Sequence, residues 1–326
     1  MTSSSLFSCD LPDLAVIEIA GQDAPAFLQG QLTHDVASLP PDRARLNGYC
    51  TPKGRLLASL VLWRDGRGDD APRFLALIKQ DIADAIVKRL GMYILRAKVA
   101  VKQSDLSVRG VMAATPADGG IAADRDLPAD ATPWQLHQDA SRTAIAAPSV
   151  EGFARWWTIG AKPDAATAAM PAPLWQAHDI AAGLPWIVTG TQDTFIPQTV
   201  NLELIDGVSF TKGCYPGQEV VARSHYRGTL KRRMVYGVIA DAATLPEPGS
   251  DTYDARHPDG PCGRIVNAAR AGRDLSCADG GAADQVCHVL MEAQLSDLGT
   301  ADFRAGQAGG PSIAVLPLPY GLQSAA

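Results

Sequence analysis

The residue whose type and setting best suit it to chemistry is Cys214. It lies in the run Lys-Gly-Cys-Tyr-Pro-Gly-Gln-Glu at 212–219. Gly213 and Gly217 allow backbone conformations that other residues disfavour, and Pro216 fixes φ between them, so we expect a rigid turn. A chain that holds a thiol on such a turn exposes it to reactants.

The turn is expected to lead into a helix over residues 218–223, where Glu219 and Arg223 stand four apart in the favourable acid-before-base order. The positive end of the helix dipole, with the cations Lys212 and Arg223, favours the thiolate of Cys214. A thiolate is both a nucleophile and a metal ligand. The alternative is that Cys214 is a small buried hydrophobic residue, as most free cysteines are.

The other residues of the motif have two interpretations each. Gln218 and Glu219 either orient a ligand or cap the start of the helix. Tyr215 either stacks on a planar ligand or packs in the core, which is the commoner place for an aromatic residue beside a buried turn. Gly213 and Gly217 shape the turn in both interpretations.

Composition and charge narrow the class of protein. The chain has 326 residues, 46% of them hydrophobic, an ordinary globular mixture for two or three domains. Its net charge of −6 argues against direct nucleic-acid binding. No apolar run approaches the roughly 18 residues that span a membrane, and the first basic residue is Arg43, so no targeting segment is expected. We therefore expect a cytoplasmic protein without a membrane partner.

The cysteines do not follow a metal-binding pattern. They stand at positions 9, 50, 214, 262, 277 and 287, without a C-x-x-C pair. Cys287 and His288 are neighbours in an expected strand and so point to opposite faces. We expect reduced thiols and no stably bound metal, with Cys214 as a possible transient iron ligand.

Hydrophobic periodicity predicts strands interleaved with helices. One helix is expected from Asp23, with an apolar face that reaches Leu32 and Val36, and another runs from Asp81 to Gly91. No G-x-G-x-x-G or Walker motif is present, so antiparallel α+β layers are the expected architecture. The strands are expected at 14–20, 56–63, 74–78, 98–102, 108–112, 235–240, 264–268, 286–290 and 313–316.

Stretches rich in Ala, Asp, Pro and Gly at 114–133 and 160–173 predict surface loops or lobe boundaries, with a further boundary near residue 50. The last strands are short and lie between turn signals, as in a small barrel or sandwich. We expect an α+β module over 1–232, built of two lobes, and a C-terminal β-barrel over 233–326.

The motif and the blocks around it resemble the YgfZ family over most of the chain. That family is a branch of the folate-binding superfamily that includes the T-protein of glycine cleavage, an aminomethyltransferase. The resemblance implies a T-protein-like fold, with a two-lobed antiparallel sheet-and-helix folate module and a small C-terminal β-barrel. It rests on the run from Lys212 to Arg223 and on blocks at 27–33, 51–55, 93–96, 179–185, 195–198, 201–202 and 207–210.

The resemblance also implies a ligand and a role. YgfZ proteins bind tetrahydrofolate and are implicated in assembling or maintaining iron–sulfur clusters in enzymes such as the radical tRNA methylthiolase. Gln198 and Asn201 are the expected folate contacts, because amide side chains can pair with a pterin. A basic run after the motif either receives an anion such as the folate glutamate tail or forms a solvated face. This run comprises Arg223, Arg227, Lys231, Arg232 and Arg233.

The chain departs from the T-protein where that enzyme carries its acids. Ala58 and Ser59 stand at the place that the resemblance assigns to a pair of carboxylates, and the Pro-x-Glu block of the T-protein appears as Pro197-Gln198-Thr199, without the acid. None of these side chains can hold or remove a proton at neutral pH. Aminomethyl transfer by the T-protein mechanism is therefore not expected.

The favoured hypothesis is a protein that binds tetrahydrofolate, or a one-carbon derivative, and assists iron–sulfur client enzymes or assembly proteins through Cys214. Lys212 and Arg223 stabilise its thiolate or bind an anion. Two alternatives stay open. A tetrahydrofolate-dependent one-carbon transferase predicts folate turnover with a defined product. A folate-binding regulator with a structural cysteine predicts that Cys214→Ala leaves activity in the cell intact.

Overall fold

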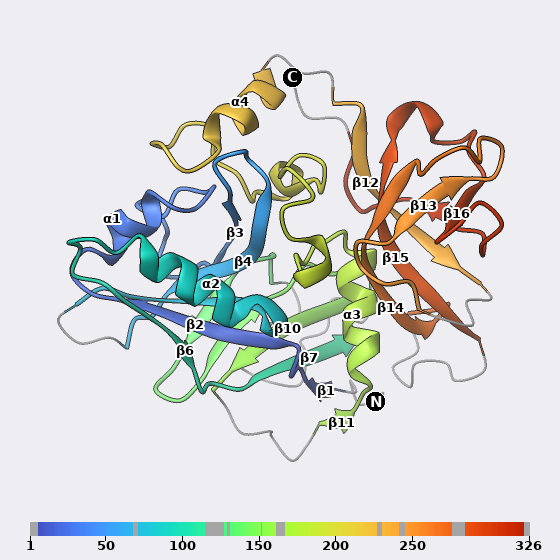
Figure 1. Ribbon diagram of the computed structural model, residues 1–326. Helices are drawn as coiled ribbons and strands as arrows, with labels where there is room; N and C mark the ends of the chain where they lie inside the picture. Colours follow the sequence, from blue (N-terminus) through green and yellow to red (C-terminus); the bar gives the residue numbers. More distant parts are fainter. Residues whose placement is uncertain are drawn as a thin grey trace.

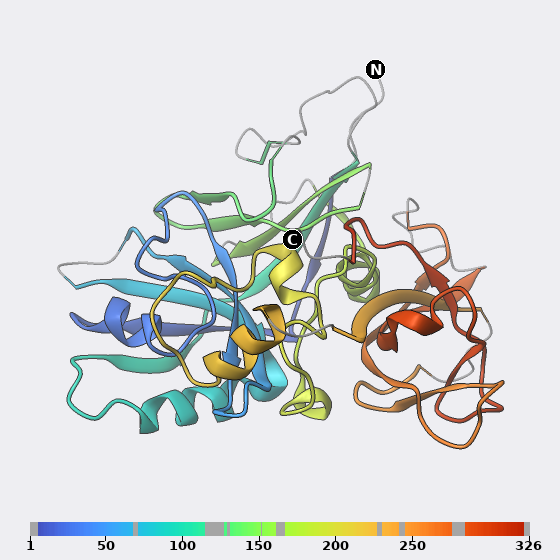
Figure 2. The same cartoon turned by 90° about the horizontal axis from the view of Figure 1, so that it is seen from above.

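Three β-sheets form the body of the chain (Figure 1). Two sheets from the N-terminal part pack together, and the third, orange to red, lies beside them (Figure 2). The computed structural model describes residues 6–67, 71–114, 127–128, 131–150, 152–160, 167–226, 230–240, 245–275 and 284–322.

The first sheet is antiparallel, in the order β3, β4, β5, β2, β6. Its side chains alternate between two faces, as the pleat requires. In β2, Ile17 and Ile19 face the core that contains helix α2, whereas Leu14 and Val16 join the core shared with the second sheet. The strands in sheet order are Arg45–Cys50, Leu56–Arg64, Arg73–Lys79, Leu14–Ala20 and Ala100–Ser104.

Two helices belong to this sheet, α1 (Ala24–Gln29) and α2 (Gln80–Met92). Helix α2 buries Ile82, Ile86 and Leu90, which recur every four residues on one side. With helices on one face and the second sheet on the other, strand β4 is buried along almost its whole length.

The second sheet has the order β11, β1, β7, β10, β9, β8 and is antiparallel except for the pair β1 and β11. Helix α3 (Ala172–Ala181) follows β11 and packs against β1 of this sheet and against β14 and β15 of the third. The strands in sheet order are Ala168–Ala169, Leu6–Asp10, Val108–Ala114, Phe153–Ile159, Thr143–Ala146 and Leu136–Gln138.

The third sheet is antiparallel in the order β16, β13, β14, β15, β12, β17 and curls into a half-barrel (Figure 1). A register shift between Ile265 and Asn267 marks an irregularity in β14. Its strands in sheet order are Phe303–Ala305, Asp251–Asp254, Gly263–Gly272, Gln285–Gln294, Arg232–Ile239 and Ala314–Leu316. Short 3₁₀ helices occupy Thr189–Thr191, Leu202–Ile205 and Leu295–Asp297.

The predicted α+β class is confirmed, but the extent of the first helix is wrong. Helix α1 ends at Gln29, because the chain beyond it pairs with β3, with a bridge from Leu32 to Tyr49. Leu32 and Val36 are nevertheless buried, from a loop. Helix α2 passes through Gly91 and ends one residue later, at Met92.

The expected boundaries do not share one structural setting: some coincide with the end or start of a strand, and others lie partly outside the described residues. Residue 50 ends strand β3 inside a hairpin of the first sheet, and residue 232 begins strand β12 of the third sheet. The stretch 160–173 includes β11 and the start of α3, although 161–166 lie outside the described residues. Most of 114–133 also lies outside them.

Candidate functional site

Cys214 is exposed, on the turn that leads into helix α4 (Gln218–Tyr226). The helix starts where the sequence predicts it. Both views show this helix, in gold, close to the hairpin between β3 and β4 (Figures 1 and 2). The alternative interpretation of Cys214 as a buried hydrophobic residue is therefore wrong.

Two glycines bring the cysteine turn against that hairpin. Gly217 has φ of +83° and Gly54 has φ of +74°, a region that disfavours side chains. A Cβ atom on Gly217 would lie 2.5 Å from both Gly54 Cα and Thr51 O. Gly213 differs, because a Cβ there would meet no atom within 4 Å and its φ is not among the positive values. The expectation that both glycines are needed for the turn is confirmed only for Gly217.

The Lys212 side chain turns into the protein. Its Nζ donates hydrogen bonds to the backbone oxygens of Gln29, at 2.5 Å, and Leu32, at 2.6 Å, just where helix α1 ends. Burial lowers the pKa of this lysine to about 8, while the charges of Asp35 and of a Cys214 thiolate favour the ammonium form. Lys212 thus fastens the cysteine turn to the end of α1, in addition to any electrostatic effect on the thiol.

Arg223 does not depend on the thiol for a partner. It donates to Glu219 across one helical turn at 2.6 Å, and both side chains are exposed. Gln218 is the first residue of the helix, and its N–H donates to the Tyr215 carbonyl. Tyr215 is buried with its ring 5.1 Å from the ammonium of Lys212, which favours core packing over ligand stacking.

Gln198 and Asn201, the expected folate contacts, are fully buried. Gln198 Nε2 donates to the carbonyl of Val221 in α4 at 2.6 Å, and Asn201 Nδ2 donates to that of Met234 in β12 at 2.7 Å. Within the described part of the chain, their amide oxygens have no hydrogen-bond partner. The two amides join the segment before Leu202 to α4 and to the third sheet, and their contact with folate stays a prediction.

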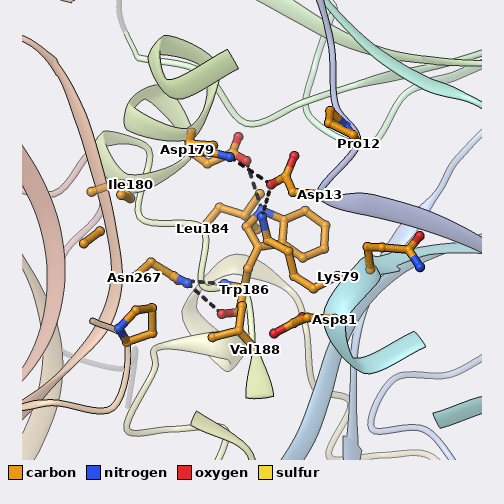
Figure 3. Close-up of a pocket in the computed structure, with 14 residues that line it drawn as sticks. Pro12, Asp13, Lys79, Asp81, Asp179, Ile180, Leu184, Trp186, Val188 and Asn267 are labelled. Atoms are coloured by element: carbon orange, nitrogen blue, oxygen red, sulfur yellow. Dashed lines mark hydrogen bonds and ion pairs between the residues drawn. The ribbon is translucent and has the colours of Figure 1, made fainter. Parts of the chain in front are cut away.

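A cavity of about 420 Å³ lies where the first sheet, α3 and the third sheet meet (Figure 3). Sequence reasoning missed it, because its lining residues come from segments far apart in the chain. Neither Cys214 nor the two amides line it. The lining residues are Pro12, Asp13, Lys79, Gln80, Asp81, Gln176, Asp179, Ile180, Leu184, Trp186, Val188, Pro248, Asn267 and Ala268.

Asp13 is one of the charged residues that line the cavity. Its Oδ2 accepts from Lys79 Nζ at 2.6 Å and from Gln176 Nε2 at 3.0 Å. Its Oδ1 is buried, with no hydrogen-bond partner among the described residues. An ionised carboxylate accepts several hydrogen bonds, so Asp13 is suited to accept a donor from a bound molecule.

The part of the cavity wall around Trp186 is held by several hydrogen bonds. Trp186 donates its indole N–H to Asp179 at 2.9 Å, and its backbone exchanges two hydrogen bonds with the amide of Asn267. Asp179 in turn forms a buried ion pair with Arg155. Asp179 is the first residue of the 179–185 block, and this block was the sequence feature that pointed to this part of the cavity wall.

Ala58 and Ser59, which stand where the transferase carries its acids, have structural roles in this protein. Ala58 is buried, and the Ser59 hydroxyl donates to the Pro185 carbonyl at 2.9 Å and accepts from the Ile187 N–H at 3.0 Å. The hydroxyl is occupied by the segment that leads to Trp186, so it positions the cavity wall.

The basic run after the motif does not line the cavity. Arg233 is buried against Glu203 at 2.5 Å, and Arg232 lies 3.3 Å from Glu292. Arg227 lies outside the described residues. Arg223 pairs with Glu219, so three members of the run have acidic partners. Binding of a glutamate tail by this run stays a prediction.

Among the described residues, no group of three or more His, Cys, Asp or Glu is arranged to hold a metal ion. Within the same part of the chain, no helix combines the length and apolar character needed to cross a membrane.

Comparison with known proteins places the chain in a family. No model of a protein family matches it. The tRNA-modifying protein YgfZ of Edwardsiella ictaluri is 32% identical over 325 residues, covering 95% of this chain and 91% of the relative. That of Sodalis glossinidius is 30% identical over 322 residues, covering 96% and 92%.

The fold comparison agrees. The crystal structure of the glycine cleavage system aminomethyltransferase T from Bartonella henselae matches with a TM-score of 0.66 and 14% identity, covering 98% of this chain and 87% of that one. This likeness confirms the predicted T-protein-like fold. The identity to curated relatives over nearly the whole length, together with the resemblance of the cysteine motif, means that this chain belongs to the YgfZ family of tRNA-modifying proteins.

Proposed function

We propose that the protein binds tetrahydrofolate, or a one-carbon derivative, in the cavity beside Asp13. The cavity itself, with the carboxylate of Asp13 in its lining, is the observation that carries this proposal. A pterin presents a ring N–H and an amino group, both of which a carboxylate accepts. The volume of about 420 Å³ falls within the range of small-molecule sites, roughly 300–1,000 Å³.

The other lining residues fit a flat ligand. Trp186 and Ile180 offer apolar surface, while the Lys79 ammonium, 5.5 Å from the Trp186 ring, balances the charge of Asp13. When bound, tetrahydrofolate supplies a carrier for a one-carbon unit. The residues of the chain hold and orient it and exclude water from it.

We propose that the role of the protein is to assist the assembly or maintenance of iron–sulfur clusters in tRNA-modifying client enzymes such as the radical methylthiolase, through the Cys214 thiolate. The relatives are named tRNA-modifying proteins, which supports a role tied to that process. Cys214 is exposed on a turn held by Lys212 and Gly217, where a client can reach it. Because Cys214 does not line the cavity, the thiol and the folate site can be tested separately.

The folate site is tested by titrating tetrahydrofolate into the protein in a calorimeter. Asp13→Asn removes the carboxylate and is expected to raise Kd at least about tenfold, the equivalent of ~1.4 kcal/mol. Asp10→Asn is the matched control, because Asp10 is an exposed carboxylate outside the cavity. Equal affinity of all three proteins, or no binding to the wild type, contradicts the site.

The role of the thiol is tested by methylthiolase activity in cells that lack the protein. Wild type and Cys262→Ser are expected to restore activity, and Cys214→Ser is expected not to. Cys262 is the control because it is a partly exposed thiol away from the motif. If Cys214→Ser also restores activity, the cysteine is structural and a folate-binding regulator is favoured. If a defined folate product accumulates with purified protein, the one-carbon transferase is favoured.

A further inference from the structure

One surface segment carries several cations, no carboxylate and exposed apolar side chains. Residues 85–104 contain five Lys and Arg residues and no Asp or Glu, in a protein whose net charge is −6. Within it, large apolar side chains are exposed: Met92 by 62%, Tyr93 by 43% and Leu95 by 87%. We call these three residues, with the exposed Lys88, Arg96 and Lys98, the basic apolar patch.

The exposure follows from where helix α2 ends. Up to Leu90 the helix buries one apolar residue per turn against the first sheet. The chain then folds into tight turns, with hydrogen bonds from Tyr93 N to Leu90 O at 3.0 Å and from Leu95 N to Tyr93 O at 3.1 Å. These bonds hold the backbone in place, so Met92, Tyr93 and Leu95 are presented to solvent by a defined loop.

Among the described residues, the three cations of the patch form no ion pair, and the carboxylates of neighbouring segments have other roles. Asp23 accepts the backbone N–H of Lys98 at 2.7 Å and so stabilises the loop itself. Glu18 pairs with Arg73 at 2.6 Å and with Lys102 at 3.4 Å. Asp84 precedes Lys88 by one turn on α2 and lies at the edge of the patch. The patch therefore combines three exposed cations with three exposed apolar side chains.

The chemistry of this surface favours a protein over a nucleic acid as its occupant. A phosphate backbone satisfies Lys and Arg but cannot bury a methionine and a leucine. A single exposed aromatic residue also falls short of the stacking platforms that bind single strands. Met, Tyr and Arg are the residues enriched at the centres of protein interfaces.

We infer that the basic apolar patch docks a partner protein whose contact surface has an apolar recess edged by carboxylates. The recess receives Leu95, Met92 and Tyr93, and the carboxylates face Lys88, Arg96 and Lys98. None of these residues belongs to the cavity or to the cysteine motif. The inference therefore stands apart from the proposed folate and cysteine functions.

The test begins with a photoreactive amino acid placed at position 95, or at 245 as the control, in the full-length protein in cells. Leu245 is a suitable control because it is a partly exposed leucine, 38% accessible, outside the patch. The protein cross-linked from position 95 but not from 245 is identified and purified, and its affinity for the unmodified chain is measured by calorimetry.

The expected partner binds the wild type and Leu245→Asp alike, within about twofold. Leu95→Asp and the double variant R96E/K98E are each expected to weaken binding at least about tenfold. Both variants should unfold at the wild-type urea concentration, since their side chains are exposed. Cross-links from 95 to RNA or lipid, cross-links no different from those at 245, or unchanged affinity of Leu95→Asp would each overturn the inference.

Discussion

The substitution Gly217→Ala tests how the cysteine turn is held. The alanine would retain φ of +83°, and its Cβ would lie 2.5 Å from Gly54 Cα and from Thr51 O and 2.6 Å from Gly54 N. All three contacts are with backbone atoms, so no flexible side chain can swing aside. Either the turn or the hairpin must move.

The expected cost has two parts. A left-handed conformation costs a residue with a Cβ about 1–2 kcal/mol. Overpacking against a fixed backbone costs typically about 1–3 kcal/mol more. Because Val220 and Val221 both donate to the carbonyl of Gly217, displacement of the turn also disturbs the start of α4. We expect Gly217→Ala to lower the free energy of unfolding by about 2–5 kcal/mol.

Gly213→Ala is the matched control, since it makes the same change in the same motif. Its Cβ meets nothing within 4 Å, so we expect a change within about 0.5 kcal/mol. Urea unfolding of both variants gives the difference in their free energies of unfolding, calculated from the two midpoints and a shared slope. The rate at which a thiol reagent modifies Cys214 reports whether the turn has shifted in the folded protein. If Gly217→Ala lies within about 1 kcal/mol of Gly213→Ala, the close approach to Gly54 does not hold the turn.

Two further predictions concern buried ionisable groups. Lys212→Met leaves the carbonyls of Gln29 and Leu32 without their donor and should destabilise the fold by about 2 kcal/mol; the exposed Lys231→Met should change stability by less than about 0.5 kcal/mol, and equal urea midpoints for both would refute the structural role. Burial lowers the pKa of His178 to about 3, with the charge of Arg155 acting in the same direction, so the folded histidine stays neutral while the unfolded one gains a proton below about 6.5. Its contribution to stability is therefore complete above pH 6.5 and is lost as the pH falls toward 3, by about 2 kcal/mol at pH 5. In urea unfolding at pH 7 and pH 5, the His178→Leu variant should therefore lose less stability on acidification than the wild type. If both proteins lose the same amount, the assignment of this loss to His178 is refuted.

Local patterns in the sequence were enough to predict several elements. The run 14–20 is strand β2 as predicted, because β-branched and aliphatic residues fill both covered faces of a pleated strand. Helix α4 begins at Gln218 because Gly217 ends the turn immediately before it. Strand β3, with Asn47 and Gly48 in its middle, was missed, since its pairing with β4 outweighs a weak local preference.

The sequence by itself determined the cysteine motif, its exposed turn and the family to which the chain is similar. Only the tertiary structure decided that Lys212 caps the end of α1 and that Gly217 meets Gly54. It also decided the cavity, where Asp13 meets Lys79, 66 residues along the chain. The physical reason is the range of the interactions. Turn and helix preferences act between neighbours in sequence, whereas a cavity forms where separately folded sheets and helices pack.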